Sequence, residues 1–200
     1  MLIGIYSPAA GSGKSAIADH LITHHNFARL SFAEPLKDMV RVLLENFGYS
    51  PTDAHDLTHI HKGAPIYEID PRIDSRHLLR TIGTEWGRSC IHTDIWLRCW
   101  TARYMRLTSE GYDRIVVDDM RFLNEANLLA RLDAQLWSVE RTGTPRSTTH
   151  ASEGGLDSLK LLSDPTNDYS LGFHHLINND GTLGDLHFQV NALLTTPQSP

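Results

Sequence analysis

The sequence LIGIYSPAAGSGKSAIADHLI, residues 2–22, predicts the architecture of the whole chain. An apolar run at residues 2–7 leads into a glycine-containing turn, and apolar residues then recur at helical spacing over residues 16–22. This order predicts a buried strand, a loop and a helix. A glycine loop in this setting is where a GxxxxGK[ST] motif cradles phosphate. The alternative, a glycine turn that merely ends a strand, is disfavoured by this placement.

The loop runs from Ser7 to Ser15, and its parts have separate tasks. Gly11 and Gly13 let backbone N–H groups curl around a phosphate at the positive end of the helix. Lys14 can reach the β- and γ-phosphates and act in catalysis, and the Ser15 hydroxyl can ligate Mg²⁺. The sequence therefore predicts an ATP and Mg²⁺ site that includes Ala10, Gly11, Ser12, Gly13, Lys14, Ser15 and Ala16.

Pro8 stands where such loops usually have their first glycine, six residues before the lysine. Proline supplies neither a positive φ nor a backbone donor, so the start of the loop can differ in shape. The phosphate-facing part, AGSGKS, is intact.

The rest of the chain continues the alternation of strands and helices. Further strands are predicted within 27–32, 113–119, 135–140 and 174–177, and helices within 35–47, 76–87, 93–107, 122–132 and 183–194. Prolines, histidines and acidic residues at 48–75 predict a surface loop or mobile insertion. We therefore predict an α/β fold, a three-layer sandwich whose five-stranded parallel sheet has helices on both faces, as one domain over residues 1–200.

Asp118 and Asp119 close the apolar strand Ile115–Val117. An acid at the end of a buried strand beside a phosphate loop is how the second metal-handling group of such enzymes is presented. Asp118 is therefore the predicted Mg²⁺ ligand beside Ser15. An acidic pair that merely caps a helix is the alternative.

Arginines supply the positive charge that phosphoryl transfer between two anions requires. Arg121 lies just past the strand-end acids, and Arg141 and Arg146 lie in a polar stretch, at about residues 141–155, where a closing lid is predicted. Arg121, Arg141 and Arg146, with Arg88 as a further candidate, are thus predicted to clamp the transition state. A solvated surface role is the alternative for each.

Composition restricts the class of protein. The net charge of -6 argues against a protein that coats nucleic acid. Cys90 and Cys99 lack the paired spacing of a zinc or redox motif, so reduced thiols in a cytoplasm are expected. No apolar stretch approaches the roughly 18 residues of a membrane span, and no membrane partner is expected.

Several blocks give the chain a resemblance to the phage-type deoxynucleoside monophosphate kinases of the P-loop kinase group. GTEWGR, at residues 83–88, and DDMRFLNEA, at 118–126, are the more specific ones. The other blocks are SFAEPLKD at 31–38, HASE at 150–153 and INNDGTLGDL at 177–186.

This resemblance implies ATP on the phosphate loop and a small-molecule nucleotide as acceptor. It places the acceptor-binding segment, with an insertion, at about residues 34–112. It implies acceptor contacts from Lys37, Trp86, Arg88 and Arg121, and a place in the host cytoplasm if the chain is phage-encoded. A homodimer is left open. Without the resemblance, the GTEWGR block predicts a helix that ends at Gly83 and a Trp86 buried in the core.

Three other functions compete. A deoxynucleoside kinase would need a general base, for which Glu34 is the candidate; a helix N-terminal carboxylate is the simpler interpretation of that residue. A kinase of a hydroxymethylated base in DNA would need a local basic groove. A nucleotide-binding switch without turnover is the third. His55, His59 and His61 could hold a metal, but a solvated or acceptor-gating loop is the better interpretation.

Overall fold

The computed structural model describes residues 1–144, 156, 158–159, 161 and 171–195. The chain divides into two compact units. We call residues 1–31 with 105–200 the sheet unit, and residues 32–104 the helical unit. The helix α5, Ile95–Ser109, begins in the second and ends in the first.

The sheet unit contains the predicted five-stranded sheet, and every strand pair in it is parallel. The spatial order is β2-β5-β1-β6-β7. The central strand β1 therefore has β5 and β6 as neighbours, and the loop that follows it leaves the sheet between them. The strands are β1 Leu2–Tyr6, β2 Ala28–Arg29, β5 Ile115–Val117, β6 Gln135–Glu140 and β7 His175–Asn178.

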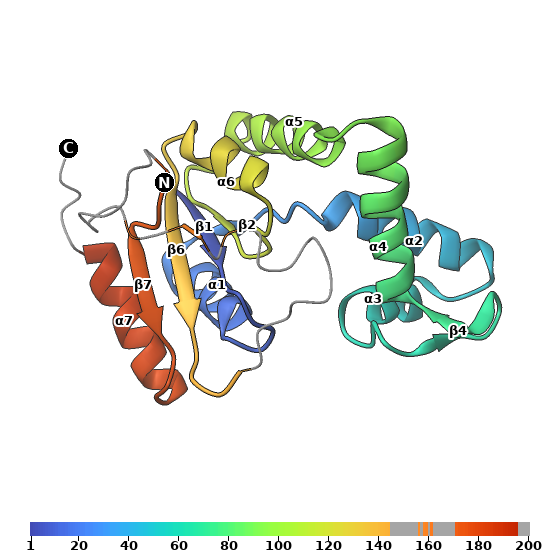
Figure 1. Cartoon of the computed structure of the whole chain (residues 1–200), viewed down its shortest axis with the longest axis horizontal. Helices are drawn as coiled ribbons and strands as arrows, with labels where there is room; N and C mark the ends of the chain where they lie inside the picture. The colour runs from blue at the N-terminus through green and yellow to red at the C-terminus, as the bar shows by residue number, and fades with distance from the viewer. Residues whose placement is uncertain (145–155, 157, 160, 162–170, 196–200) are drawn as a thin grey trace. The chain divides into compact units, whose positions relative to one another are not determined.

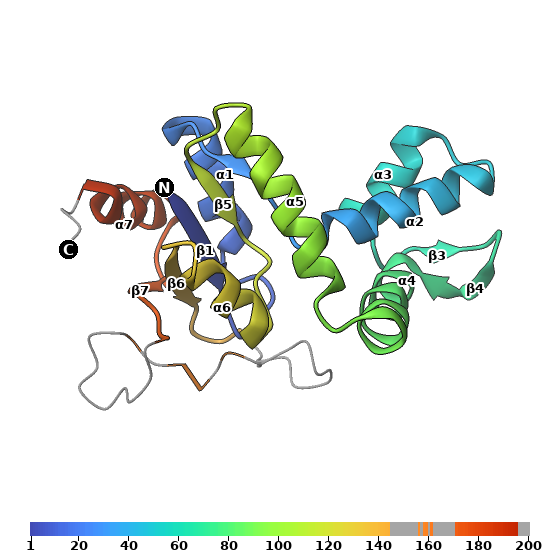
Figure 2. The same cartoon turned by 90° about the horizontal axis from the view of Figure 1, so that it is seen from above.

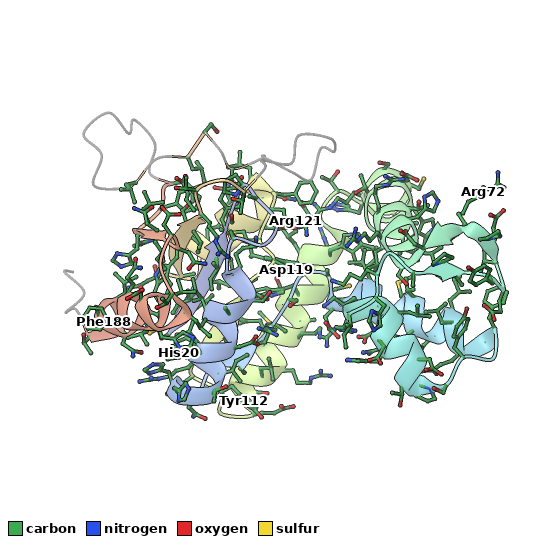
Figure 3. The ribbon with its side chains drawn as sticks, turned by 90° about the horizontal axis from the view of Figure 1, so that it is seen from below. His20, Arg72, Tyr112, Asp119, Arg121 and Phe188 are labelled. Carbon is green, nitrogen blue, oxygen red and sulfur yellow. The ribbon has the colours of Figure 1, made fainter. Side chains whose placement is uncertain are left out.

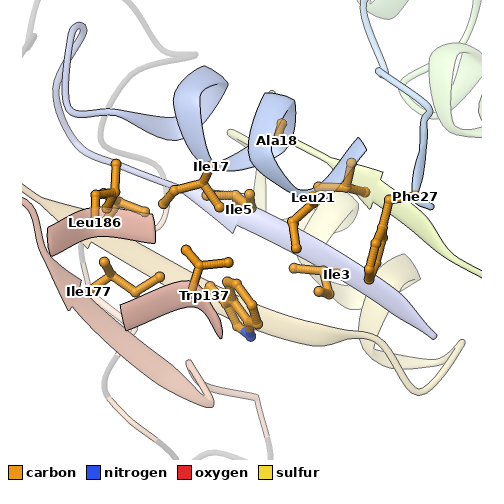
Figure 4. Packing of buried hydrophobic residues seen from close by; sticks show 12 residues of the cluster. Ile3, Ile5, Ile17, Ala18, Leu21, Phe27, Trp137, Ile177 and Leu186 are labelled. Atoms are coloured by element: carbon orange, nitrogen blue, oxygen red, sulfur yellow. The ribbon is translucent and has the colours of Figure 1, made fainter. Parts of the chain in front are cut away.

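Helices cover both faces of this sheet, which confirms the α/β sandwich (Figure 1). On one face Ile3 and Ile5 pack with residues of α1, Lys14–His25, and α7, Leu183–Thr195 (Figure 4). On the other face α6, Leu123–Ala130, comes so close that a Cβ on Gly4 would lie 2.7 Å from Leu129 Cδ1. Because neighbouring side chains of a strand point to opposite faces, β1 is buried on both sides.

The helical unit is built from helices and one hairpin (Figure 2). Its core gathers Val40, Leu44, Ala54 and Ile66. The helix α4 runs directly into an eleven-residue π-helix. The elements are α2 Glu34–Asn46, α3 Pro51–His59, β3 Pro65–Ile66, β4 Asp70–Asp74, α4 Ser75–Arg80 and the π-helix Thr81–Ile91.

The prediction of a surface loop at 48–75 is wrong. The segment contains α3 and the antiparallel hairpin β3–β4. Ser50 caps α3 by accepting a hydrogen bond from Asp53 N, and Pro51 takes the first helical position, where its missing N–H costs nothing. The fully buried residues of α3 are Ala54 and Thr58, and Leu57 is partly buried against the same core, so the helix shows only a weak apolar stripe in the sequence.

Two boundaries also differ from expectation. The helix predicted at 76–87 continues to Ile91 through the π-helix. The strand predicted at 27–32 has only two ladder residues, those of the edge strand β2, which pairs with β5. The chain still follows β5 beyond it, because Leu30 N donates to Val116 O at 3.0 Å. Across the described part of the chain, no helix has both the length and the hydropathy needed to cross a bilayer.

Candidate active site

The phosphate loop has the conformation that its glycines predict. Gly11 has φ 74° and Gly13 has φ 108°, both in the left-handed region that favours glycine. Gly13 is the N-cap of α1, and Lys14 is the first residue of the helix. The backbone N–H groups at this helix start are therefore in position to face an anion.

Ser7 shapes the start of the loop around Pro8. Ala9 N donates to Ser7 Oγ at 3.2 Å, which makes a local turn of the kind that serine hydroxyls support. Pro8 itself needs no positive φ, because Gly11 and Gly13 supply both left-handed positions of the loop.

Lys14 folds back over the loop, where Nζ donates to Ala9 O at 3.3 Å. Burial lowers the pKa of Lys14, and the charge of Arg121 lowers it further, while Asp118 and Asp119 act in the opposite direction. The ammonium group is thus within electrostatic reach of one arginine and both strand-end acids. The sheet topology brings these residues together, because β5 and β1 are parallel neighbours whose carboxyl ends meet at one edge.

Two residues near the end of β2 hold Asp118: Arg29 is the last residue of the strand, and Ser31 follows it. Ser31 Oγ donates to Asp118 Oδ1 at 3.5 Å, and Arg29 Nη2 lies 3.5 Å from Asp118 Oδ2. The side chain of Asp118 is 11% exposed. Sequence reasoning missed both partners, since each lies more than eighty positions away in the chain.

The helix-cap alternative for the acidic pair is wrong. The N-cap of α6 is Phe122, and the carboxylate of Glu125 accepts from Arg121 N at 2.8 Å and Phe122 N at 3.1 Å. Glu125 is buried, so it fixes the backbone that carries Arg121. Figure 3 shows Asp119 and Arg121 on the segment that follows β5. A glutamate three residues after the N-cap, as Glu125 is after Phe122, is one half of a capping box. This spacing could have indicated the start of α6 in the sequence.

Arg141 directly follows β6 and is exposed. Asp180 lies near it: Thr142 N and Thr142 Oγ1 donate to its carboxylate at 2.6 and 2.8 Å. These two hydrogen bonds, with a smaller contribution from the charge of Arg141, lower the pKa of Asp180. Arg146 and residues 145–155 of the predicted lid lie outside the described residues, so the lid role stays a prediction.

Asn179, at the end of β7, contacts the phosphate loop and was not singled out from the sequence. Asn179 Nδ2 donates to Ser12 O at 2.8 Å. The residue is 7% exposed, and its own backbone N donates to Glu140 O at 2.8 Å.

The helical unit places Lys37 in a network of charges at the start of α2. Lys37 Nζ lies 3.1 Å from Glu34 Oε2, and Arg41 Nη1 lies 3.7 Å from Glu34 Oε1. Arg41 also pairs with Asp38, which accepts from Arg103 Nη1 at 3.2 Å. Burial alone would raise the pKa of Glu34, but Lys37, together with His59 and Arg41, lowers it overall.

Trp86 and Arg88 lie on the π-helix, a rare geometry that is frequent at functional sites. Trp86 is 43% exposed, so the prediction of a buried Trp86 after a helix that ends at Gly83 is wrong. The buried indole of the region is Trp96, whose Nε1 donates to Gly83 O at 2.7 Å. Arg88 Nη1 donates to Thr93 O at 3.4 Å.

His55 and His59 stack in α3 with ring centroids 4.1 Å apart, and His59 Nε2 lies 3.6 Å from Glu34 Oε1. The interpretation of this segment as a loop is therefore wrong. These contacts do not add support for a metal site. Among the residues that the structure describes, no cluster of three or more His, Cys, Asp or Glu is arranged to hold a metal ion.

The chain is similar to known proteins over most of its length. A family model described as deoxynucleotide monophosphate kinase matches residues 43–190. A protein of Acanthamoeba polyphaga mimivirus that is provisionally named a deoxynucleotide monophosphate kinase is 30% identical over 171 residues, which cover 80% of this chain and 84% of that protein.

Two phage relatives are more distant. The deoxynucleotide monophosphate kinase of Escherichia phage RB69 is 25% identical over 74% of this chain and 54% of its own length. That of Enterobacteria phage T4 is 26% identical over 64% of this chain and 48% of its own length. The chain thus aligns with about half the length of these two phage enzymes.

In structure, the chain is similar to TT1252 from Thermus thermophilus, with a TM-score of 0.51 and 19% identity over 98% of both chains. This likeness concerns the fold alone. The family match begins at residue 43, after the phosphate loop, so the loop and the match are independent observations. Together with the mimivirus relative, they lead to one conclusion: the chain belongs to the deoxynucleotide monophosphate kinase family.

Proposed function

We propose that this kinase transfers the γ-phosphate of ATP to a deoxynucleoside 5'-monophosphate and releases the diphosphate and ADP. The observation that carries the proposal is a phosphate loop whose Lys14 is within electrostatic reach of Asp118, Asp119 and Arg121, in a chain of this family. Phosphoryl transfer depends on positioning and charge neutralisation, which such a group of residues supplies.

The sheet unit holds ATP in this proposal. The Ser12 hydroxyl is buried and has no hydrogen-bond partner among the described residues, which a phosphate oxygen would provide. The loop N–H groups bind the phosphates and Lys14 neutralises charge on the transferred group. Mg²⁺ suits the available donors, since the Ser15 hydroxyl and the Asp118 carboxylate are hard oxygen ligands. When bound, Mg²⁺ would neutralise charge on the β- and γ-phosphates.

We assign acceptor binding to the helical unit, with Lys37 and Arg88 as cations and Trp86 as an exposed aromatic surface for a base. Arg121 would neutralise the transferring phosphate. The exposure of Trp86 supports this assignment, because a buried indole could not meet a base.

A monophosphate fits this chain better than a nucleoside. A phosphate acceptor is already an anionic nucleophile, whereas a sugar hydroxyl needs a general base. Glu34, the candidate base, is ion-paired with Lys37 and Arg41, and its pKa is lowered. A carboxylate with a lowered pKa is a weaker base, which disfavours the nucleoside kinase.

Steady-state ADP release tests the proposal across four deoxynucleoside monophosphates, the matching nucleosides and hydroxymethylated duplex DNA. Lys14→Ala should abolish most turnover, by about 10²-fold or more. Lys62→Ala, on the turn before β3 and without a predicted role, is the matched control and should retain activity. Turnover with nucleosides alone would move the chemistry to Glu34, and turnover with DNA alone would make the chain a nucleic-acid-modifying enzyme. Full activity in Lys14→Ala would refute the site.

A further inference from the structure

We propose that Asn179 is a positioning residue of the phosphate loop, which fixes the Ser12–Gly13 peptide so that Gly13 N–H points at the bound phosphates. The inference rests on the proposed function only in taking ATP as the molecule held by this loop. It assigns a role in donor binding to the end of β7, a part of the chain outside the loop motif.

The geometry of one peptide group carries the proposed role. Ser12 C=O and Gly13 N–H belong to one planar peptide unit, and in a trans peptide they point in opposite directions. The described chain has no cis peptide bond. Asn179 Nδ2 donates to Ser12 O at 2.8 Å and so sets the direction of that carbonyl. The direction of Gly13 N–H is then set as well, away from Asn179.

Asn179 itself has little freedom to move. It is 7% exposed, and its backbone N donates to Glu140 O at 2.8 Å, which extends the pairing of β6 with β7. Its side chain therefore projects from the rigid edge of the sheet. A donor on a rigid element orients its partner more narrowly than a loop residue does.

Gly13 fits closely against the same side chain. A Cβ at Gly13 would lie 2.4 Å from Asn179 Nδ2 and 3.4 Å from Leu186 Cδ2. The glycine is needed for its φ of 108° and also for this contact. Any side chain at residue 13 would displace the amide that holds Ser12 O. The conformation of the loop and the position of Asn179 thus depend on each other.

Two near-isosteric variants test the role. Asn179→Leu and Asn179→Asp keep the approximate shape and remove the N–H donor. Asn178→Leu is the matched control, since residue 178 is the neighbouring asparagine and is exposed. The readout is the dissociation constant of inorganic tripolyphosphate and of ADP by titration calorimetry, beside the thermal midpoint and the separate KM values for ATP and the monophosphate.

We expect Asn179→Leu to bind tripolyphosphate and ADP about tenfold more weakly, the effect of one lost orienting hydrogen bond. Asn179→Asp should lose at least as much, because its added charge also repels the phosphates. The KM for ATP should rise by a similar factor while the KM for the monophosphate changes by less than about twofold. Asn178→Leu should bind as the wild type does. If Asn179→Leu does not fold, Asn179→Asp decides the result by comparison with Asn178→Asp, because an added negative charge by itself weakens the binding of a phosphate.

A folded Asn179 variant that binds tripolyphosphate as tightly as the wild type would overturn the role, even if its thermal midpoint is lower. A rise in both KM values together would do the same, since it indicates general damage to the fold. A wild-type chain that binds tripolyphosphate but phosphorylates no monophosphate would refute the proposed function and leave this inference standing.

Discussion

At the scale of single residues, Arg29 offers a comparison of two carboxylates, since it pairs with Asp19 at 2.8 Å and Asp118 at 3.5 Å. The side chain of Asp19 is 66% exposed, whereas that of Asp118 is 11% exposed. The charge of Asp118 also acts on Lys14. We expect Asp118→Asn to lower kcat by about 10²-fold, because a metal ligand is lost. Asp19→Asn should stay within about twofold, since exposed ion pairs contribute little. Initial rates against Mg²⁺ concentration check this, and equal effects of both variants would contradict a metal role for Asp118.

Glu34 separates the monophosphate kinase from the nucleoside kinase. Removing a general base typically costs a factor of about 10²–10⁴ in rate. Because Glu34 is an ion-pair partner of Lys37 and Arg41 in our account, Glu34→Gln should lower kcat less than about tenfold. The measurement is kcat with a monophosphate and, in parallel, with Glu45→Gln, an exposed glutamate of the same helix. A loss in the range of a missing base would revive the nucleoside kinase.

At the scale of elements, the π-helix depends on a glycine that admits Trp96. A Cβ at Gly87 would lie 2.4 Å from Trp96 Cζ2 and 2.8 Å from Ile82 O. Gly87→Ala should therefore lower the free energy of unfolding by about 1–3 kcal/mol, as overpacking does. Gly63→Ala is the matched control, because its nearest neighbour would be 3.9 Å away. Urea unfolding of both variants measures the difference, and equal stability would show that Trp96 can move aside.

The contact between α1 and α7 carries a cluster of histidines. His20 stacks on His187 with centroids 4.0 Å apart and lies 4.8 Å from His24, and His20 and His25 both contact Asn191 Oδ1 at 2.8 Å. Burial lowers the pKa of His187, and His20 and His24 lower it further. Arg114 donates to the backbone of His25, so it adds a cation rather than a compensating anion at this end of α1.

Acidification should therefore destabilise this contact. A histidine whose folded-state pKa is depressed resists protonation in the folded chain, so stability is present above the unfolded pKa of about 6.5 and is lost as pH falls below it. Unfolding in urea at about pH 7.5 and pH 5.5 should show a smaller loss for His187→Gln than for the wild type. The exposed His61→Gln should behave as the wild type does, and an unchanged pH dependence in His187→Gln would sink the explanation.

At the scale of the whole molecule, the sheet could be predicted because its three inner strands, β1, β5 and β6, are buried on both faces. Such strands appear as apolar runs, as at Ile115–Val117, and their alternation with helices implies a parallel sheet. The helical unit was harder to predict, because the fully buried residues of α3 are Ala54 and Thr58 and its one large apolar residue, Leu57, is only partly buried. The π-helix has no pattern that separates it from an α-helix.

The same contrast holds for the candidate site. The positions of Lys14, Ser15 and Asp118 at the helix start and the strand end were predictable, because a local motif and an apolar run place them. Arg29 and Asn179 were not, since each acts through a partner distant in the sequence: Asp118 for the first and Ser12 for the second.

The most direct test follows the transferred phosphate. The chain is incubated with ATP labelled at the γ-phosphate, Mg²⁺ and each deoxynucleoside monophosphate in turn, and the labelled products are separated and identified. Our account predicts that the label appears in a deoxynucleoside diphosphate, in amounts equal to the ADP formed, and that Lys14→Ala suppresses it. Label that appears only as inorganic phosphate, or in no monophosphate-dependent product, would contradict the assignment of this chain as a monophosphate kinase.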